Sequence, residues 1–329
     1  MFAAAAIIII SIVAGVNIII IMMSTDLEAA DIMMCCASCG KAEVDDIKLM
    51  TCTACKSVRY CGVKCQRDHR PKHKRACKKR AAELRDEVLF KQPESSNYGD
   101  CPICYLPLSI DADKSTMKSC CSKIICDGCY FANKSSELKQ RQVHKCPFCR
   151  HPLARTDKEI NMCIMKRVEA NDPVAMSDMG GHRYQEGDYS SALEYLTKAA
   201  GMGDIMAHDQ LSIMYRKGQG VEKDEKRELY HLEEAAIGGH PWARHNLGCH
   251  EENNGRIERA MKHFIIAANL GYDDSIKLLK REYAKGRISK EDLEAALRAH
   301  QAAVNATKSP QREAAEAAKQ DGSLVYSWS

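Results

Sequence analysis

The sequence predicts a multidomain protein in which two small cysteine-rich modules precede an all-α helical-repeat solenoid. The chain has 329 residues, enough for two or three domains, and sixteen of its 18 cysteines lie between Cys35 and Cys149. These cysteines recur as C-x2-C pairs with histidines between them, which is typical of metal ligation in a reducing compartment. From about residue 160 the composition changes to Ala, Leu, Glu and Lys, and the sequence repeats.

Changes in composition set the expected boundaries. Residues 1–34 form an apolar segment and an acidic spacer. The later segments are a first cysteine-rich module at 35–80, a short helix and linker at 81–100, a second cysteine-rich module at 101–153, helical repeats at 171–303 and a tail at 304–329. The two lone cysteines, Cys163 and Cys249, are expected to be small core residues.

The N-terminal segment, residues 2–23, is a run of 22 residues without a charge. As a helix rising about 1.5 Å per residue it is long enough to span a bilayer. No Lys or Arg precedes it and no clear cleavage site follows it. Three interpretations remain open: a membrane anchor, an unusual signal segment, or a true translation start at Met22 or Met23. In each case the metal modules are expected inside the cell, in the cytoplasm or nucleus, because an oxidising lumen would destroy free thiolates.

Charge and motifs exclude several function classes. The net charge of +4 is too small to indicate a nucleic-acid-binding protein. The basic run at 67–80 can contact phosphates, but the solvated face of a finger helix is the better interpretation, so nucleic acid is not an expected partner. The sequence has no P-loop, no G-x-S-x-G and no H-E-x-x-H.

The repeats share the frame A-A-x-x-G, which occurs at residues 199, 235 and 267. A period in the thirties indicates stacked helix pairs, with alanines where helices approach and left-handed glycines where they end. Residues 218–224 are expected to be a loop within the longest unit. The pattern resembles Sel1-like repeats, a branch of the tetratricopeptide class, over 171–303. Units start at Asn171, Gly203, Gly239 and Gly271, spaced 32, 36 and 32 residues apart.

Eight side chains of the first module are spaced as four pairs, enough for two tetrahedral zinc sites. The C-x2-C spacing gives a tight turn with both sulfurs on one side, and the x3 spacing suits one helical turn. Cys35 is an alternative to Cys36, although its spacing is less suitable. The pairs are Cys36 and Cys39, Cys52 and Cys55, Cys61 and Cys65, and His73 and Cys77.

The run YCGVKCQRDHRPKHKRAC in this module resembles the MYND finger. The resemblance implies a protein-interaction module that often takes short proline-containing peptides. The family usually has Trp where this chain has Arg70, and His69 is expected to be a solvated helix residue. The resemblance also implies interleaved sites, with Cys36, Cys39, Cys61 and Cys65 on one zinc ion and Cys52, Cys55, His73 and Cys77 on the other.

The second module also holds eight candidate ligands: Cys101, Cys104, Cys120, Cys121, Cys126, Cys129, Cys146 and Cys149. The sequence CPIC, CCSKIICDGC and CPFCR resembles a RING finger. The usual histidine ligand falls on Lys123, so the adjacent Cys120 and Cys121 are interpreted as the third and fourth ligands; His144 as a replacement for one of them is the alternative. The resemblance implies a cross-brace, with Cys101, Cys104, Cys126 and Cys129 on one zinc and Cys120, Cys121, Cys146 and Cys149 on the other.

Four zinc ions per chain are therefore expected, and a closed shell of protein ligands makes each of them structural. A RING finger implies a ubiquitin ligase that positions a ubiquitin-charged conjugating enzyme and forms no covalent intermediate. Ile103, Pro147 and Arg150 match the conjugating-enzyme contacts, unless they only pack the zinc loops or face solvent. The open alternatives are a ligase and a non-catalytic adaptor. The expected partners are proteins: a conjugating enzyme, short peptide motifs and a repeat-bound partner, with a membrane possible through residues 2–23.

Overall fold

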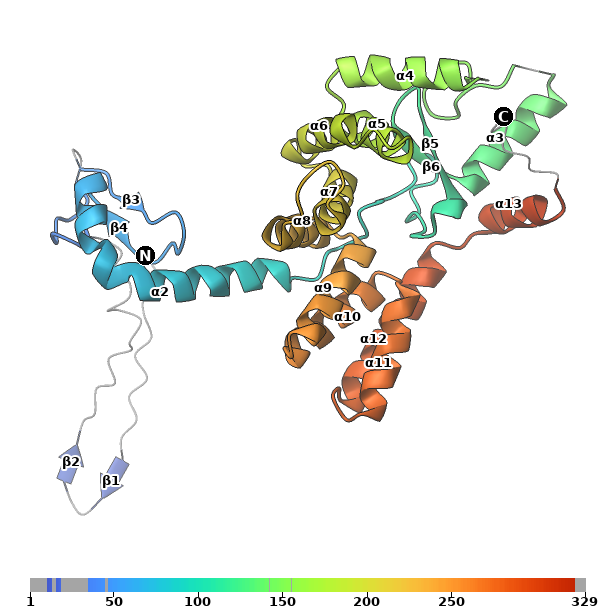
Figure 1. The fold of residues 1–329 in the computed structure, drawn as a ribbon. Helices are drawn as coiled ribbons and strands as arrows, with labels where there is room; N and C mark the ends of the chain where they lie inside the picture. The colour runs from blue at the N-terminus through green and yellow to red at the C-terminus, as the bar shows by residue number, and fades with distance from the viewer. Residues whose placement is uncertain are drawn as a thin grey trace. The chain divides into compact units, whose positions relative to one another are not determined.

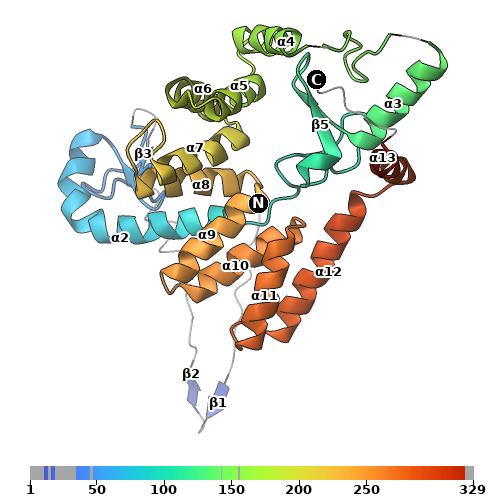
Figure 2. The same ribbon diagram turned by 45° about the vertical axis from the view of Figure 1, so that its right-hand side comes forward.

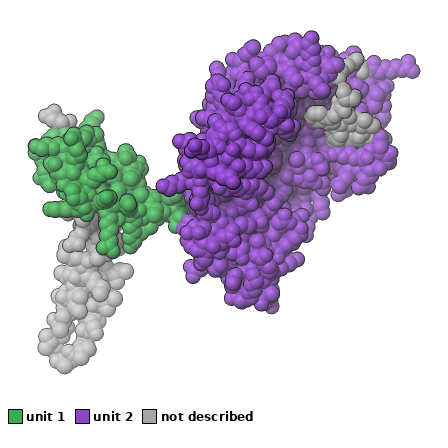
Figure 3. All heavy atoms as spheres, in the orientation of Figure 1, with its two compact units in different colours: residues 1–88 green, residues 89–329 purple. Residues whose placement is uncertain are grey.

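The computed structural model describes residues 11–13, 16–18, 35–44, 47–141, 143–154 and 156–322. The chain divides into two compact units, residues 1–88 and residues 89–329, which Figure 3 colours green and purple. Within the described ranges, no helix combines the length and the apolar content needed to cross a membrane. Most of the apolar segment at 2–23 lies outside the described residues; its described parts are two short strands.

The described part of the first unit holds four short strands and all but the last residue of a long helix (Figure 1). Among residues 35–88 that the structure describes, few side chains are buried: Cys36, Leu49, Cys52, Cys55 and Tyr60. So small a core needs metal ions to fold stably. The elements are β1 (Ser11–Val13) paired with β2 (Val16–Ile18), β3 (Met50–Thr51) paired with β4 (Arg59–Tyr60), and helix α2 (Val63–Leu89).

Helix α2 differs from the short helix expected after residue 81. It runs without a break from Val63 to Leu89, so the expected helix is the second half of a longer one. The residues after it are also not a free linker. The Asn97 N–H donates to the carbonyl of Gly239 at 3.1 Å, which fixes this segment to the repeats.

The second cysteine-rich module is a hairpin followed by a helix. Its elements are the 3-10 turn η1 (Ala112–Lys114), β5 (Ser115–Lys118), β6 (Lys123–Cys126) and α3 (Asp127–Lys139). β5 and β6 pair antiparallel with Ser115 opposite Cys126 and Lys118 opposite Lys123. This register places Cys120 and Cys121 in the turn of the hairpin. Cys126 caps α3, because its Sγ accepts a hydrogen bond from the Cys129 N–H at 3.5 Å.

Residues 157–320 form a series of helices (Figures 1 and 2). Helix α5 packs on α6, α7 on α8 and α9 on α10, and α11 and α12 extend the array from α10. The helices are α4 (Asp157–Glu169), α5 (Pro173–Gln185), α6 (Tyr189–Gly201), α7 (Ile205–Lys217), α8 (Glu225–Ile237), α9 (Pro241–Asn253), α10 (Ile257–Asn269), α11 (Asp273–Ala284), α12 (Lys290–Ala306) and α13 (Pro310–Gln320).

The structure confirms the helical-repeat prediction and its physical basis. All six alanines of the A-A-x-x-G frames are buried, and residues 218–224 form the loop between α7 and α8. A Cβ on Gly248 would lie 2.5 Å from the Phe264 ring, so α9 and α10 approach closely there. Each predicted unit start is a left-handed residue, with φ of 57° at Asn171, 87° at Gly203, 86° at Gly239 and 93° at Gly271.

The tail at 304–329 contains a helix whose bounds and packing partner were not predicted from the sequence. Helix α13 leaves the repeat array after α12 and packs against α3 of the second cysteine-rich module. Both views show the two helices side by side (Figures 1 and 2). The tail helix and the second module are therefore in direct contact.

Candidate metal centres

Sixteen ligand atoms gather into four groups of four, and within each group the atoms lie within 4.8 Å of one another. They come from the sixteen residues singled out in the sequence, in the interleaved pairing that the two resemblances imply. Cys35 is in none of these groups. The groups are Cys36, Cys39, Cys61 and Cys65; Cys52, Cys55, His73 and Cys77; Cys101, Cys104, Cys126 and Cys129; and Cys120, Cys121, Cys146 and Cys149.

One local backbone turn builds half of every group. In each of four C-x2-C pairs, the N–H of the residue after the second cysteine donates to the carbonyl of the first, and the donor residue is left-handed. This turn points both sulfurs to the same side. The donors are Gly40 (2.8 Å, φ 74°), Lys56 (3.0 Å, φ 57°), Tyr105 (2.8 Å, φ 57°) and Arg150 (2.9 Å, φ 62°).

The sulfur separations fit zinc. Cys39 and Cys61 are 3.6 Å apart, and Cys104 and Cys126 are 3.8 Å apart. Tetrahedral zinc with Zn–S bonds of about 2.3 Å requires sulfurs about 3.8 Å apart, whereas a disulfide requires about 2.05 Å. His73 presents Nε2 to its group, 3.2 Å from the Cys55 sulfur. The four groups therefore fit four structural zinc ions, each with a closed shell of protein donors.

Within one group, neighbouring thiols shift each other's pKa values in opposite directions, as expected of a site that needs a cation. A hydrogen bond with the Cys126 thiol lowers the pKa of Cys101 to about 4, and the same contact raises the pKa of Cys126. Cys146, whose pKa is lowered to about 4, has the same relation to Cys120, whose pKa is raised. Neighbouring thiolates repel one another, so all four ionise together only around a positive ion.

Both adjacent cysteines take part in the fourth group. The sulfur of Cys120 lies 3.4 Å from that of Cys149, and the sulfur of Cys121 lies 3.9 Å from that of Cys146. His144 has a different role, because its Nδ1 lies 3.1 Å from a carboxylate oxygen of Glu137. The structure therefore does not realise the alternative in which His144 replaces one cysteine.

The three candidate contacts for a conjugating enzyme are accessible to different degrees. Ile103 is 37% exposed, Pro147 is half-buried and Arg150 is exposed. The Arg150 guanidinium donates to the side-chain oxygen of Asn133 on α3 at 3.2 Å. The sequence reasoning passed over Phe148, which is 43% exposed inside the same C-x2-C turn. The sequence did contain a signal for this residue. Phe148 is an aromatic side chain between two ligands, Cys146 and Cys149, in a short turn that has no core of its own for the ring to fill.

In the first module, the expectation that His69 is solvated is wrong. His69 is half-buried, its Nδ1 lies 3.1 Å from the Tyr60 hydroxyl, and its ring stacks on His73 at 5.6 Å. The reason is helical spacing, since residues four apart share one face and His73 faces the other ligands of its group. Arg70, at the usual Trp position, is exposed.

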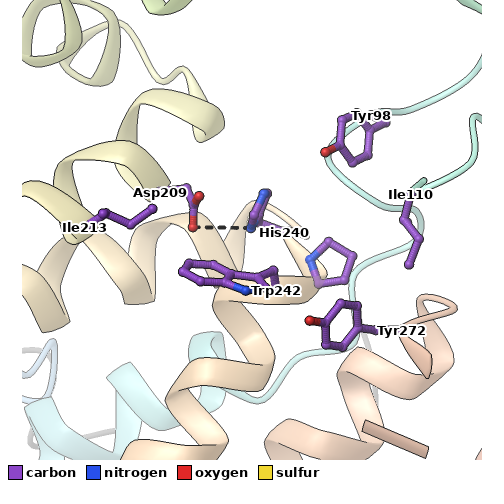
Figure 4. A pocket seen from close by; sticks show the side chains of 8 residues that line it. Tyr98, Ile110, Asp209, Ile213, His240, Trp242 and Tyr272 are labelled. Atoms are coloured by element: carbon purple, nitrogen blue, oxygen red, sulfur yellow. Dashed lines mark ion pairs between the residues drawn. The ribbon is translucent and has the colours of Figure 1, made fainter. Parts of the chain in front are cut away.

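The repeats carry a cavity of about 260 Å³ with one buried acid (Figure 4). Asp209 Oδ1 lies 3.5 Å from His240 Nδ1. That nitrogen accepts the Ala243 N–H, so it donates nothing to the carboxylate. Burial raises the pKa of Asp209 to about 7. The cavity is lined by Tyr98, Ile110, Asp209, Ile213, His240, Pro241, Trp242 and Tyr272.

A larger cavity of about 780 Å³ lies between the second module and helices α12 and α13. Its lining includes both acidic side chains, such as Asp111 and Glu313, and basic ones, such as Lys114 and Lys308. This mixture does not select a ligand of one charge.

Comparisons with known proteins identify two parts of the chain. The MYND finger model matches residues 36–77, and the Sel1 repeat model matches residues 173–204, 205–240 and 244–272. The chain therefore contains a MYND finger and three Sel1 repeats, both of which are protein-interaction modules. A search of curated proteins found no match.

Two solved structures are similar to about half of the chain. One is a Sel1 repeat protein from Oxalobacter formigenes, with 23% identity, a TM-score of 0.40, and 51% of each chain covered. The other is c5321, a protective antigen present in uropathogenic Escherichia coli strains and displaying an SLR fold, with 20% identity and a TM-score of 0.36. That match covers 53% of this chain and 38% of the antigen. The chain thus spans about half the length of the first relative and less of the second.

Proposed function

We propose that this protein is a RING-type ubiquitin ligase whose MYND finger and Sel1 repeats hold the protein to be modified. One observation carries the proposal: the second module has two interleaved four-cysteine groups, with a hairpin and helix α3 between their ligands. That arrangement has the connectivity of a cross-brace.

Catalysis in this proposal is by positioning. Each group supplies four protein donors, so the zinc has no open position for water or substrate. The activity therefore depends on the surface beside the zinc turns, where Ile103 is available for apolar contact. Arg150 projects from the last zinc turn, and its side chain makes one exposed hydrogen bond to Asn133. A guanidinium held this loosely is free to exchange that bond for a carbonyl of ubiquitin and fix the thioester in a reactive arrangement.

A non-catalytic adaptor is the second candidate, and one contact favours it. The bond from Arg150 to Asn133 joins the last zinc turn to α3, which is a structural use of the same side chain. In an adaptor the four zinc ions would only stabilise interaction modules.

The test is autoubiquitination by the full chain with activating enzyme, ATP, ubiquitin and a panel of conjugating enzymes. Arg150→Ala is compared with Lys56→Ala, a matched control: both residues follow a C-x2-C pair, are exposed, and have left-handed backbones. The ligase proposal expects ubiquitin ladders that weaken at least tenfold in Arg150→Ala and persist in Lys56→Ala, with four zinc ions in every protein. If protein that holds four zinc ions forms no ubiquitin ladders with any conjugating enzyme, the ligase proposal is wrong and the adaptor function remains.

A further inference from the structure

Helix α13 brings an arginine to the first zinc site of the second module. Arg312 lies in the first turn of α13, and three of the four hydrogen bonds that its guanidinium donates cross to the module, 205 to 208 positions earlier in the chain. The fourth bond stays within the Arg312 segment, at the carbonyl of Thr307. The distances are 2.6 Å to the Pro107 carbonyl, 3.1 Å to the Leu106 carbonyl, 3.4 Å to the Cys104 sulfur and 2.8 Å to Thr307.

The contact with Cys104 matters because Cys104 belongs to a group of four cysteines. Four thiolates around one Zn²⁺ leave a net charge of about −2 at a site whose other three cysteines are buried. A guanidinium that donates to a ligand sulfur offsets part of this charge and orients the ligand. Groups that do so control how tightly a site keeps its metal.

Close packing between α13 and α3 fixes the position of Arg312. A Cβ on Gly128 would lie 2.9 Å from the backbone nitrogen of Arg312, so only glycine allows this approach. Over the next two turns, Ala315 and Ala318 are buried against Tyr130. At the far end of α13, the Lys319 ammonium pairs with the Asp127 carboxylate at 2.5 Å.

We propose that α13 is part of the second zinc module and that Arg312 is an outer-shell partner of its first zinc ion. Arg312 holds Cys104 in place and slows loss of the metal. The same helix attaches the module to the last helices of the repeats, because only residues 307–309 separate α12 from α13. This inference rests on the zinc sites and not on ligase activity.

The experiment measures zinc transfer from the full, zinc-loaded chain to a chromogenic chelator. Arg312→Gln is compared with Arg298→Gln, a matched control on α12 whose side chain is 72% exposed. One of four zinc equivalents is expected to leave about tenfold to a hundredfold faster in Arg312→Gln, while Arg298→Gln behaves as wild type. Release curves of Arg312→Gln that superimpose on those of the wild type would overturn the proposal.

A second readout separates contact with the sulfur from simple packing. In the cobalt-substituted protein, loss of an N–H bond to a ligand sulfur is expected to shift the sulfur-to-cobalt charge-transfer band. Arg312→Gln should shift this band. Lys319→Gln, which weakens the other end of α13, should not. An unshifted band in Arg312→Gln would rule out the outer-shell role. If Arg312→Gln does not fold, Arg312→Lys is measured instead. Lysine keeps the positive charge but lacks the planar fork of N–H donors of the guanidinium, so a rate of zinc release between that of the wild type and the hundredfold limit is expected.

Discussion

Arg244 donates a hydrogen bond to the carbonyl of Leu89, joining the end of helix α2 to the repeats. The Arg244 side chain is fully buried, and its second terminal nitrogen donates to the Ala236 carbonyl at 2.6 Å. Burial lowers the pKa of Arg244 to about 10, so the guanidinium still carries its charge at neutral pH. Since no ion pair of Arg244 is found among the described residues, this buried cation is held by carbonyl dipoles, and it fixes where the chain enters the repeats.

Replacing Arg244 by Met should therefore destabilise the repeats. Two buried carbonyls lose charged donors, which is expected to lower the free energy of unfolding by about 2–4 kcal/mol. Urea unfolding followed by far-UV circular dichroism measures the change. Arg298→Met, on an exposed face of α12, is the control and should change stability by less than about 0.5 kcal/mol. Equal stability of the two variants would show that the buried bonds contribute nothing.

The adjacent cysteines of the second module give a prediction of zinc content. Cys120→Ser and Cys121→Ser should each lower the content from four ions per chain to three, because both sulfurs belong to the fourth group. The matched control is Cys35→Ser, which also alters one of two adjacent cysteines but lies outside every group. Native mass spectrometry counts the ions. Four ions in either second-module variant would mean that one of the two sulfurs is dispensable.

Asp209 predicts a dependence of stability on pH. Burial raises its pKa to about 7 in the folded protein, against about 3.9 in an unfolded chain. The folded state therefore holds the proton more tightly, so this group favours folding at low pH. That advantage is lost as pH rises from about 4 to about 7, a change of up to about 4 kcal/mol.

Asp209→Asn removes the titrating group and should make the repeats less sensitive to pH. Free energies of unfolding at pH 5 and pH 8 are compared for wild type, Asp209→Asn and Glu222→Gln, an exposed carboxylate in the 218–224 loop. The difference between the two pH values should shrink only in Asp209→Asn. A difference unchanged from wild type would place the pH dependence elsewhere.

Close helix packing predicts opposite effects for two glycines. Gly248→Ala places a methyl group 2.5 Å from the Phe264 ring and should destabilise the repeats by about 1–3 kcal/mol. Gly181→Ala meets only the flexible end of Gln210, at 3.4 Å, and should stabilise helix α5 by about 0.5–1 kcal/mol. The midpoint of thermal unfolding, Tm, is measured for both variants. Changes in Tm of the same sign would contradict the prediction.

The sequence predicted what depends on local spacing. Ligand pairs such as Cys146 and Cys149 are set by turns of four residues, so their geometry follows from the motif. The repeat starts at Gly203, Gly239 and Gly271 are similarly local, because a helix end needs a left-handed residue there. These features could be placed without knowledge of the rest of the fold.

Long-range packing was out of reach of the same reasoning. Nothing near Arg312 in the sequence signals that its partner is Cys104, 208 positions away. The residues around Asn97 were predicted to be a linker, because Pro, Ser and Gly occur there. Their attachment to Gly239 depends on a backbone bond that any residue can make.

The contact between Arg312 and Cys104 also has a consequence for the order of events during translation. A ribosome adding about 5–20 residues per second needs about 10–40 s to go from Cys104 to Arg312, which are 208 positions apart. During that interval the nascent module can collect zinc, but its first site lacks the arginine. If synthesis stalls inside the repeats, Arg312 has not yet been made, and the first zinc site of the second module stays exposed to competing thiols and to proteolysis.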